Sequence, residues 1–152
     1  MTTKADFNAE EWSAIVEAPV LAGLRVVASG RGGTLRESLA MGRVYKEARR
    51  NQAQNELVDE IVASPPALDV RQLQERGDLG TLSTERVREA VRLLSEKGSP
   101  EALDEYRRFV LAVAQAAAEA HKEGGFVGIG GKPVSDEEQR AIDELRGVLD
   151  AG

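Results

Sequence analysis

Carboxylate side chains flank a glycine-rich stretch near the C-terminal end of the sequence, where binding chemistry is easiest to propose. Five glycines fall within residues 124–131. Glu119 and Glu123 precede this stretch, and Asp136 and Glu137 follow it. Carboxylates and backbone carbonyls are the oxygen ligands that hard cations prefer, whereas the free amides at a helix start attract phosphate. A cation site, a phosphate cradle and a simple chain reversal are therefore the three alternatives.

The surrounding residues argue against the phosphate cradle. A dinucleotide-binding glycine motif follows a β-strand, but the residues before Gly124 have the periodicity of a helix. Lys132 precedes a proline, where the lysine of a P-loop precedes serine or threonine. Asp136, Glu137 and Glu138 would also occupy the first turn of the next helix, where they repel an anion.

A cation site and a chain reversal remain as alternatives for residues 119–138. The candidate ligands for calcium or magnesium are Glu119, Glu123, Asp136 and Glu137, together with glycine carbonyls. The alternating acids of an EF-hand loop are absent from this segment. Acidic residues in a first helical turn also complement the helix dipole without any ligand, and glycines permit a tight reversal. We favour the chain reversal and expect no obligatory cofactor.

Catalytic chemistry finds little support in the residue types present. His121 is the only histidine, and the chain has no cysteine. A proton relay, a thiol nucleophile or a zinc cluster therefore lacks its usual partners. We expect a protein that is not an enzyme, with no catalytic and no cofactor-binding residues. Trp12 and Tyr106 lie at helical core spacing and are predicted to be packing anchors.

A second candidate surface is basic. Residues 25–50 carry seven basic and two acidic side chains, although the whole chain has a net charge of −6. On a helical wheel Arg36, Arg43, Lys46 and Arg50 share one face, opposite the apolar residues. Such a face suits an acidic protein partner, a second copy of the chain or an anionic membrane surface, while a solvated face needs no partner. An isoelectric point near 5.0, with Tyr45 as the local stacking aromatic, argues against nucleic acid.

These candidate residues require helices to position them, and the sequence favours helices throughout. Hydrophobic residues make up 41% of the 152 residues and aromatic residues only 4%. The apolar positions recur at helical spacing in each strong segment, and few runs alternate at the period of a strand. We predict an all-α bundle of about six to eight helices, forming a single domain over residues 1–152 with a weak break around 64–83.

Capping signals predict where the helices begin and end. Asn8 with Glu11, and Ser135 with Glu138, have the spacing of a capping box. Pro19 is expected to end or kink the first helix. Further helices are expected over about 34–50 and 55–64, and over two longer segments. The first of these longer helices begins at an N-cap, Ser83, and stops at Lys97–Gly98, and the second is alanine-rich and begins at Ser99–Pro100.

Two parts of the sequence resemble a known family. EYRRFVLAVAQAAAEAHKEGG (105–125), followed by VSDEEQRAIDEL (134–145), is similar to the second half of the TerB-like tellurite-resistance family. EEWSAIVEAPVLAGLRVVASG (10–30), followed by GGTLRESLAMGRVYKEAR (32–49), resembles its first half. The resemblance implies a compact, pseudo-duplicated all-α domain. It also implies divalent-cation binding through acidic residues near the helix–loop junctions, a role in stress-linked assemblies, and no catalysis.

The lack of cysteine and the lack of long apolar segments bear on the expected cellular location. The lack of cysteine fits a reducing compartment, and the N-terminal MTTKADFNAEEW has no apolar run typical of a signal peptide. No stretch has the length and apolarity of a membrane span. We expect a cytoplasmic protein that acts through contacts with other macromolecules, by binding a protein partner or by self-association. The alternative is a TerB-like divalent-cation-binding module of the stress response.

Overall fold

The fold is an all-α bundle, seen in a computed structural model that describes residues 3–29, 42–46, 56–63, 75, 77–124 and 136–150. Its elements are the 3-10 helix η1 (Lys4–Asp6) and the α-helices α1 (Ala9–Ser29), α3 (Glu56–Ala63), α5 (Leu79–Lys97), α6 (Pro100–Gly124) and α7 (Asp136–Asp150). Residues 42–46 are also helical, and no strand occurs within the described ranges. The predicted fold class is therefore confirmed.

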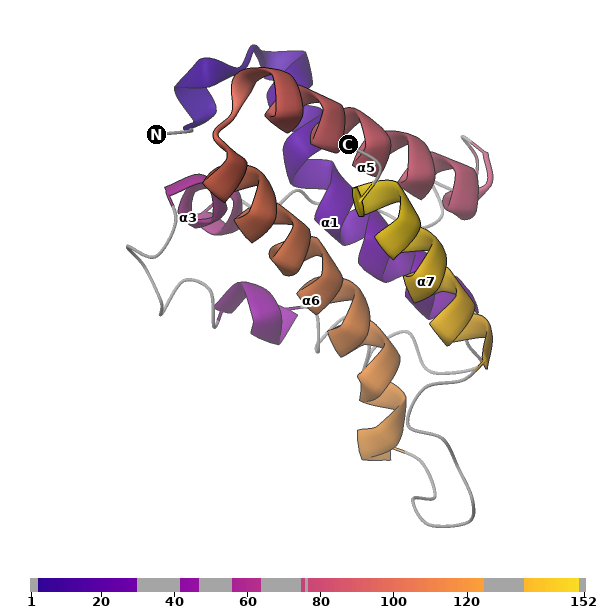
Figure 1. The fold of residues 1–152 in the computed structure, drawn as a ribbon. Helices are drawn as coiled ribbons and strands as arrows, with labels where there is room; N and C mark the ends of the chain where they lie inside the picture. The colour runs from indigo at the N-terminus through magenta and orange to yellow at the C-terminus, as the bar shows by residue number, and fades with distance from the viewer. Residues whose placement is uncertain are drawn as a thin grey trace.

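Helix α1 lies at the centre of the bundle and contacts α5, α6 and α7 (Figure 1). Helices α5 and α6 follow one another in the chain, yet each packs far more extensively on α1 than on the other. Helix α3 packs on α6. Each of these helices is too short or too polar to span a bilayer, within the part of the chain that the structure describes.

The core fills the spaces between these helices with apolar side chains. Ala114, Ala117 and Ala118 of α6 are buried, so this thin face lets α1 approach closely. The largest fully buried side chains are Tyr106, Ile15, Leu57, Ile61, Leu93, Leu94, Leu149, Val26, Val62, Val87 and Val91. These residues come from α1, α3, α5, α6 and α7, so one core joins both halves of the sequence.

Helix α1 runs through Pro19, so of the two predicted outcomes, an end or a kink at this proline, the end is wrong. Proline has no N–H, and the carbonyl of Ile15, four residues earlier, therefore loses its usual helical donor. The hydroxyl of Tyr106 in α6 donates a buried hydrogen bond of 2.7 Å to this carbonyl. A side chain from another helix thus replaces the missing amide.

The structure confirms three predicted helix boundaries. Asn8 and Glu11 form the predicted capping box, because each backbone N–H donates to the other's side chain at 2.9 Å. Helix α5 ends at Gly98, whose N–H donates to the carbonyl of Leu94. Ser99 caps α6 through its hydroxyl, which accepts from the N–H of Ala102 at 3.2 Å.

The predicted start of α5 is wrong. The helix begins at Leu79, and the carboxylate of the N-cap Asp78 accepts from the N–H of Thr81. A Cβ at Gly80 would lie 2.9 Å from this carboxylate, so the glycine belongs to the cap. Ser83 is instead fully buried inside the helix, and its hydroxyl has no hydrogen-bond partner among the described residues. Ser135, the predicted cap of α7, lies outside them.

Candidate functional site

A groove opens at the N-terminal end of the bundle, beside the start of α1. Its volume is about 710 Å³, and it is lined by Lys4, Ala5, Phe7, Asn8, Ala9, Trp12, Ser13 and Glu60. Most of these residues belong to η1 and the first turns of α1, and Glu60 comes from α3. The groove therefore lies where two segments distant in sequence meet.

Local sequence rules place the two aromatic rings of this groove. Asn8 is the N-cap of α1, so Phe7 occupies the position before the cap and Trp12 the fourth helical position. A hydrophobic pair at these two positions forms a staple that fixes how the chain enters the helix. The ring centroids of Phe7 and Trp12 are 6.3 Å apart. Phe7 is buried by this contact, whereas Trp12 is only partly buried and lines the groove.

Hydrogen bonds from backbone N–H groups to side-chain carboxylates connect the segments that form the groove. The N–H of Thr3 donates to Asp6 at 2.9 Å, which closes η1 on itself. The N–H of Lys4 donates to the carboxylate of Glu60, which ties η1 to α3. With the capping box of α1, these contacts order both walls before any partner arrives, so binding costs less conformational entropy.

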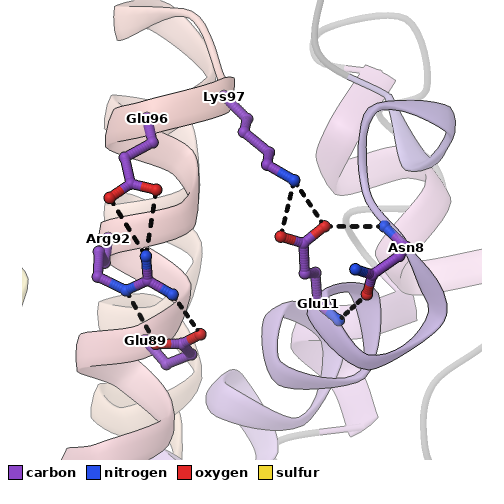
Figure 2. Close-up of polar contacts among 6 residues, drawn as sticks. All are labelled: Asn8, Glu11, Glu89, Arg92, Glu96 and Lys97. Atoms are coloured by element: carbon purple, nitrogen blue, oxygen red, sulfur yellow. Dashed lines mark hydrogen bonds and ion pairs between the residues drawn. The ribbon is translucent and has the colours of Figure 1, made fainter.

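A polar cluster joins the same end of α1 to α5 (Figure 2). The ammonium of Lys97 contacts both carboxylate oxygens of Glu11, at 2.8 and 2.7 Å. The hydrogen bond from Lys97, with a smaller contribution from the N–H of Asn8, lowers the pKa of Glu11 below its usual value. Along α5, Arg92 bridges Glu89 and Glu96, and its hydrogen bond lowers the pKa of Glu89.

The surroundings of the groove are acidic. Residues 3–13 and 57–63 hold one basic side chain, Lys4, and five acidic ones: Asp6, Glu10, Glu11, Asp59 and Glu60. Of these five acidic side chains, Glu11 is paired with Lys97, as described above. The groove thus combines an aromatic wall with a charge-balanced lining, and the exposed acids Asp6 and Glu10 beside it add negative charge, which attracts cationic groups.

The predicted cation ligands belong to the end of one helix and the start of the next. Glu119 and Glu123 belong to the last turns of α6, and Asp136 and Glu137 to the first turn of α7. Their side chains, the side chain of His121 and residues 125–135 fall outside the described part of the chain. Elsewhere in that part, no three histidine or acidic side chains come close enough to hold a metal ion. The cation site at residues 119–138 stays a prediction.

Half of the predicted basic face falls within the described residues. Arg43 and Lys46 are exposed on the helical segment 42–46, whereas Arg36 and Arg50 lie outside the described ranges. Tyr45 points inward and packs edge-on against Phe109 of α6, with ring centroids 5.2 Å apart. It is buried, so it cannot stack on a nucleic-acid base.

The groove itself was missed by sequence reasoning, because Trp12 was predicted to be a packing anchor like Tyr106. Tyr106 is fully buried, whereas Trp12 packs against the core but is only partly buried. The signal was present in the spacing of Phe7, Asn8, Glu11 and Trp12, which is that of a capping box with a staple. That spacing predicts a ring held at the helix entrance, but it does not predict that the ring lines a groove.

Comparisons of the chain with protein-family models, curated proteins and solved structures found no match. The function is therefore inferred from the chemistry of the described residues.

Proposed function

We propose that this protein is a non-enzymatic binding module that works by contact with a partner protein, and that the groove beside α1 receives the partner. One observation carries this proposal. Trp12, the only tryptophan of the chain, is partly exposed on the wall of a groove whose shape is held by backbone hydrogen bonds. Tryptophan is enriched among the residues that contribute most to protein–protein affinity.

The chemistry of the groove fits a protein interface better than a small-molecule site. Ligand pockets for small molecules enclose most of their ligand, whereas this groove is open along the surface. Its apolar side chains, Phe7 and Trp12, stand beside charged ones, Lys4 and Glu60, as in an interface with an apolar centre and a polar rim. A cytoplasmic location is part of this proposal and is supported by the lack of cysteine.

Site-specific photocrosslinking tests the proposal inside the cells that produce the protein. A photoreactive residue at position 13 lies in the groove, and one at exposed position 85 of α5 serves as the matched control. We expect a discrete adduct from position 13 only, with its partner identified by mass spectrometry, and we expect Trp12→Ala to abolish it. Equal adducts from both positions, or an adduct that survives Trp12→Ala, would contradict the proposal.

A second candidate function is the divalent-cation module that the TerB-like resemblance implies. Helix α6 ends at Gly124, helix α7 begins at Asp136, and the two helices pack on each other. The candidate is supported by this packing and by the acidic residues at the end of α6 and the start of α7. Ligands specific to the folded state raise the melting temperature by mass action.

Thermal melts with calcium or magnesium, against melts with a chelator, test this second candidate. A bound cation predicts a concentration-dependent rise in melting temperature that the double change Asp136→Asn and Glu137→Gln removes. Glu101→Gln, an exposed acid in the first turn of α6, is the matched control and should keep the rise. No rise in the unmodified protein would leave the acids as partners of the helix dipole.

A further inference from the structure

We infer that the occupant of the groove is a basic amphipathic helix of the partner, which places an apolar side chain against Trp12 and a lysine or arginine beside Glu60. This inference rests on the proposed function and names the partner's chemistry. Three properties of the groove carry it: the secondary structure of its walls, its charge and its aromatic surface.

The walls of the groove favour a helical occupant. One mode of recognising an extended peptide adds it to the edge of a sheet, and no strand occurs within the described ranges. The groove is instead bounded by η1, the start of α1 and a residue of α3. A cleft between helical segments takes the apolar face of a further helix, with anchors one turn apart.

The charge around the groove favours some classes of macromolecule as its occupant and disfavours others. The charged residues that line the groove, Lys4 and Glu60, balance one another, and the exposed acids Asp6 and Glu10 in the adjoining segment add negative charge. Phosphates of a nucleic acid or of an anionic lipid are repelled by such a field, and so is an acidic peptide. A helix with lysine or arginine on the edges of its apolar face is attracted, and its charged pairs fix its register in the groove.

Trp12 offers the occupant both an apolar and an electrostatic contact. Its ring is fixed by the staple with Phe7, so little side-chain entropy is lost when a partner covers it. A leucine or phenylalanine of the incoming helix covers apolar surface of the ring. A cationic side chain near the same ring gains from the negative face of the indole, and the carboxylate of Glu60 lines the same groove.

The chain supplies its own optical probe, because its single tryptophan lies in the groove. We would titrate the purified protein with a tryptophan-free synthetic helix of about 15 residues, long enough for partial helicity. Leucine would repeat at helical spacing, and lysine would flank it. We expect saturable binding that changes the emission of Trp12 and weakens as salt is raised, because steering between surface charges is screened. Peptides with glutamate in place of lysine, and a proline-rich peptide, should bind at least tenfold more weakly.

Charge reversal on the protein gives the matching test. Glu10→Lys should reduce the affinity of the lysine peptide and raise that of the glutamate peptide, whereas Glu85→Lys, at an exposed position on α5, should change neither. Glu60→Lys should act in the same direction, but it also removes the acceptor of the Lys4 N–H. If that loss unfolds the protein, Glu10→Lys still provides the test. Circular dichroism would confirm that each variant remains helical.

Three outcomes would overturn the inference. They are tighter binding of the glutamate or proline-rich peptide, an affinity for the lysine peptide that both lysine variants leave unchanged, and concentration-dependent self-association that Trp12→Ala abolishes. The last outcome would assign the groove to a second copy of the chain. If position 13 crosslinks to a partner but the lysine peptide does not bind, the inferred chemistry of the partner is refuted and the proposed function stands. If position 13 gives no crosslink, the proposed function is refuted as well.

Discussion

At the scale of single residues, the hydrogen bond between Tyr106 and Ile15 explains how α1 accommodates Pro19. Tyr106→Phe removes the only donor described for a buried carbonyl, which should destabilise the protein by about 1–3 kcal/mol. In a Pro19→Ala background the amide of residue 19 can donate to Ile15, so the same change should cost clearly less. A double-mutant cycle from urea unfolding measures this coupling.

Tyr45 provides the control for that cycle. It is also a buried tyrosine packed on an α6 side chain, but its hydroxyl has no hydrogen-bond partner among the described residues. Tyr45→Phe keeps the contact with Phe109 and should leave the free energy of unfolding unchanged or slightly increased, because an unpaired buried hydroxyl is unfavourable. Equal losses for the two Tyr→Phe variants would show that the bond to Ile15 contributes nothing specific.

At the scale of helices, the pair between Glu11 and Lys97 ties the start of α1 to the end of α5. Glu11→Gln isolates the charge, because glutamine can still accept the N–H of Asn8 in the capping box. The folded state lowers the pKa of Glu11, so the pair stabilises the protein above the ordinary pKa of 4.5 and is lost as the pH falls below it.

The variant should therefore melt at a lower temperature than the unmodified protein near neutral pH, and this difference should close as the solution is acidified below pH 4.5. Melts followed by circular dichroism across this range measure the gap. Glu85→Gln, at an exposed position in the same helix α5, should show no gap at any pH. A gap that stays constant on acidification would assign the effect to the cap instead of the charge.

Helix boundaries were predictable where their causes are local. The capping box at Asn8, the end of α5 at Gly98 and the start of α6 at Ser99 each depend on residues within one turn. The continuation of α1 through Pro19 depends on Tyr106, which is 91 positions away from Ile15 in the sequence. The start of α5 was predicted at Ser83 as an N-cap, although the helix begins earlier and Gly80 makes room for the Asp78 cap.

The candidate groove could not be predicted for the same reason. The staple between Phe7 and Trp12 follows from spacing, but the meeting of this segment with Glu60 of α3 is a tertiary contact. Sequence patterns also cannot tell which face of Trp12 the fold leaves uncovered. The predicted cation ligands were chosen from their charge and their place beside the glycines, and the basic face of Arg36, Arg43, Lys46 and Arg50 from charge and helical spacing. Charged residues on helices are commonly solvated.

At the scale of the whole molecule, both tyrosines of the chain report on the integrity of the fold at high pH. Tyr45 and Tyr106 are the only two tyrosines, and burial raises the pKa of each above its ordinary value of 10.0. The folded protein keeps both phenolic protons where the unfolded chain releases them, so its stability falls as the pH rises above 10.0. Tyrosinate absorbance should therefore rise in one step together with the loss of helical circular dichroism.

An absorbance change near pH 10 that precedes the loss of helicity would contradict this expectation, because it would require an accessible phenol in the folded state. Tyr45→Phe gives the internal comparison. It should halve the amplitude of the step and leave its cooperativity intact, since Tyr106 remains enclosed by α1 and α6.

The central position of α1 affects when the core can form during synthesis of the chain. Helices α5 and α6 are joined by only Gly98 and Ser99, yet the surface that each presents is covered mainly by α1, which is made much earlier. The first long helix therefore leaves the ribosome before the segments that cover it exist. Its apolar side chains stay unprotected until the middle of the chain has emerged, so nascent chains that stall before α5 should be the species that aggregate or recruit chaperones.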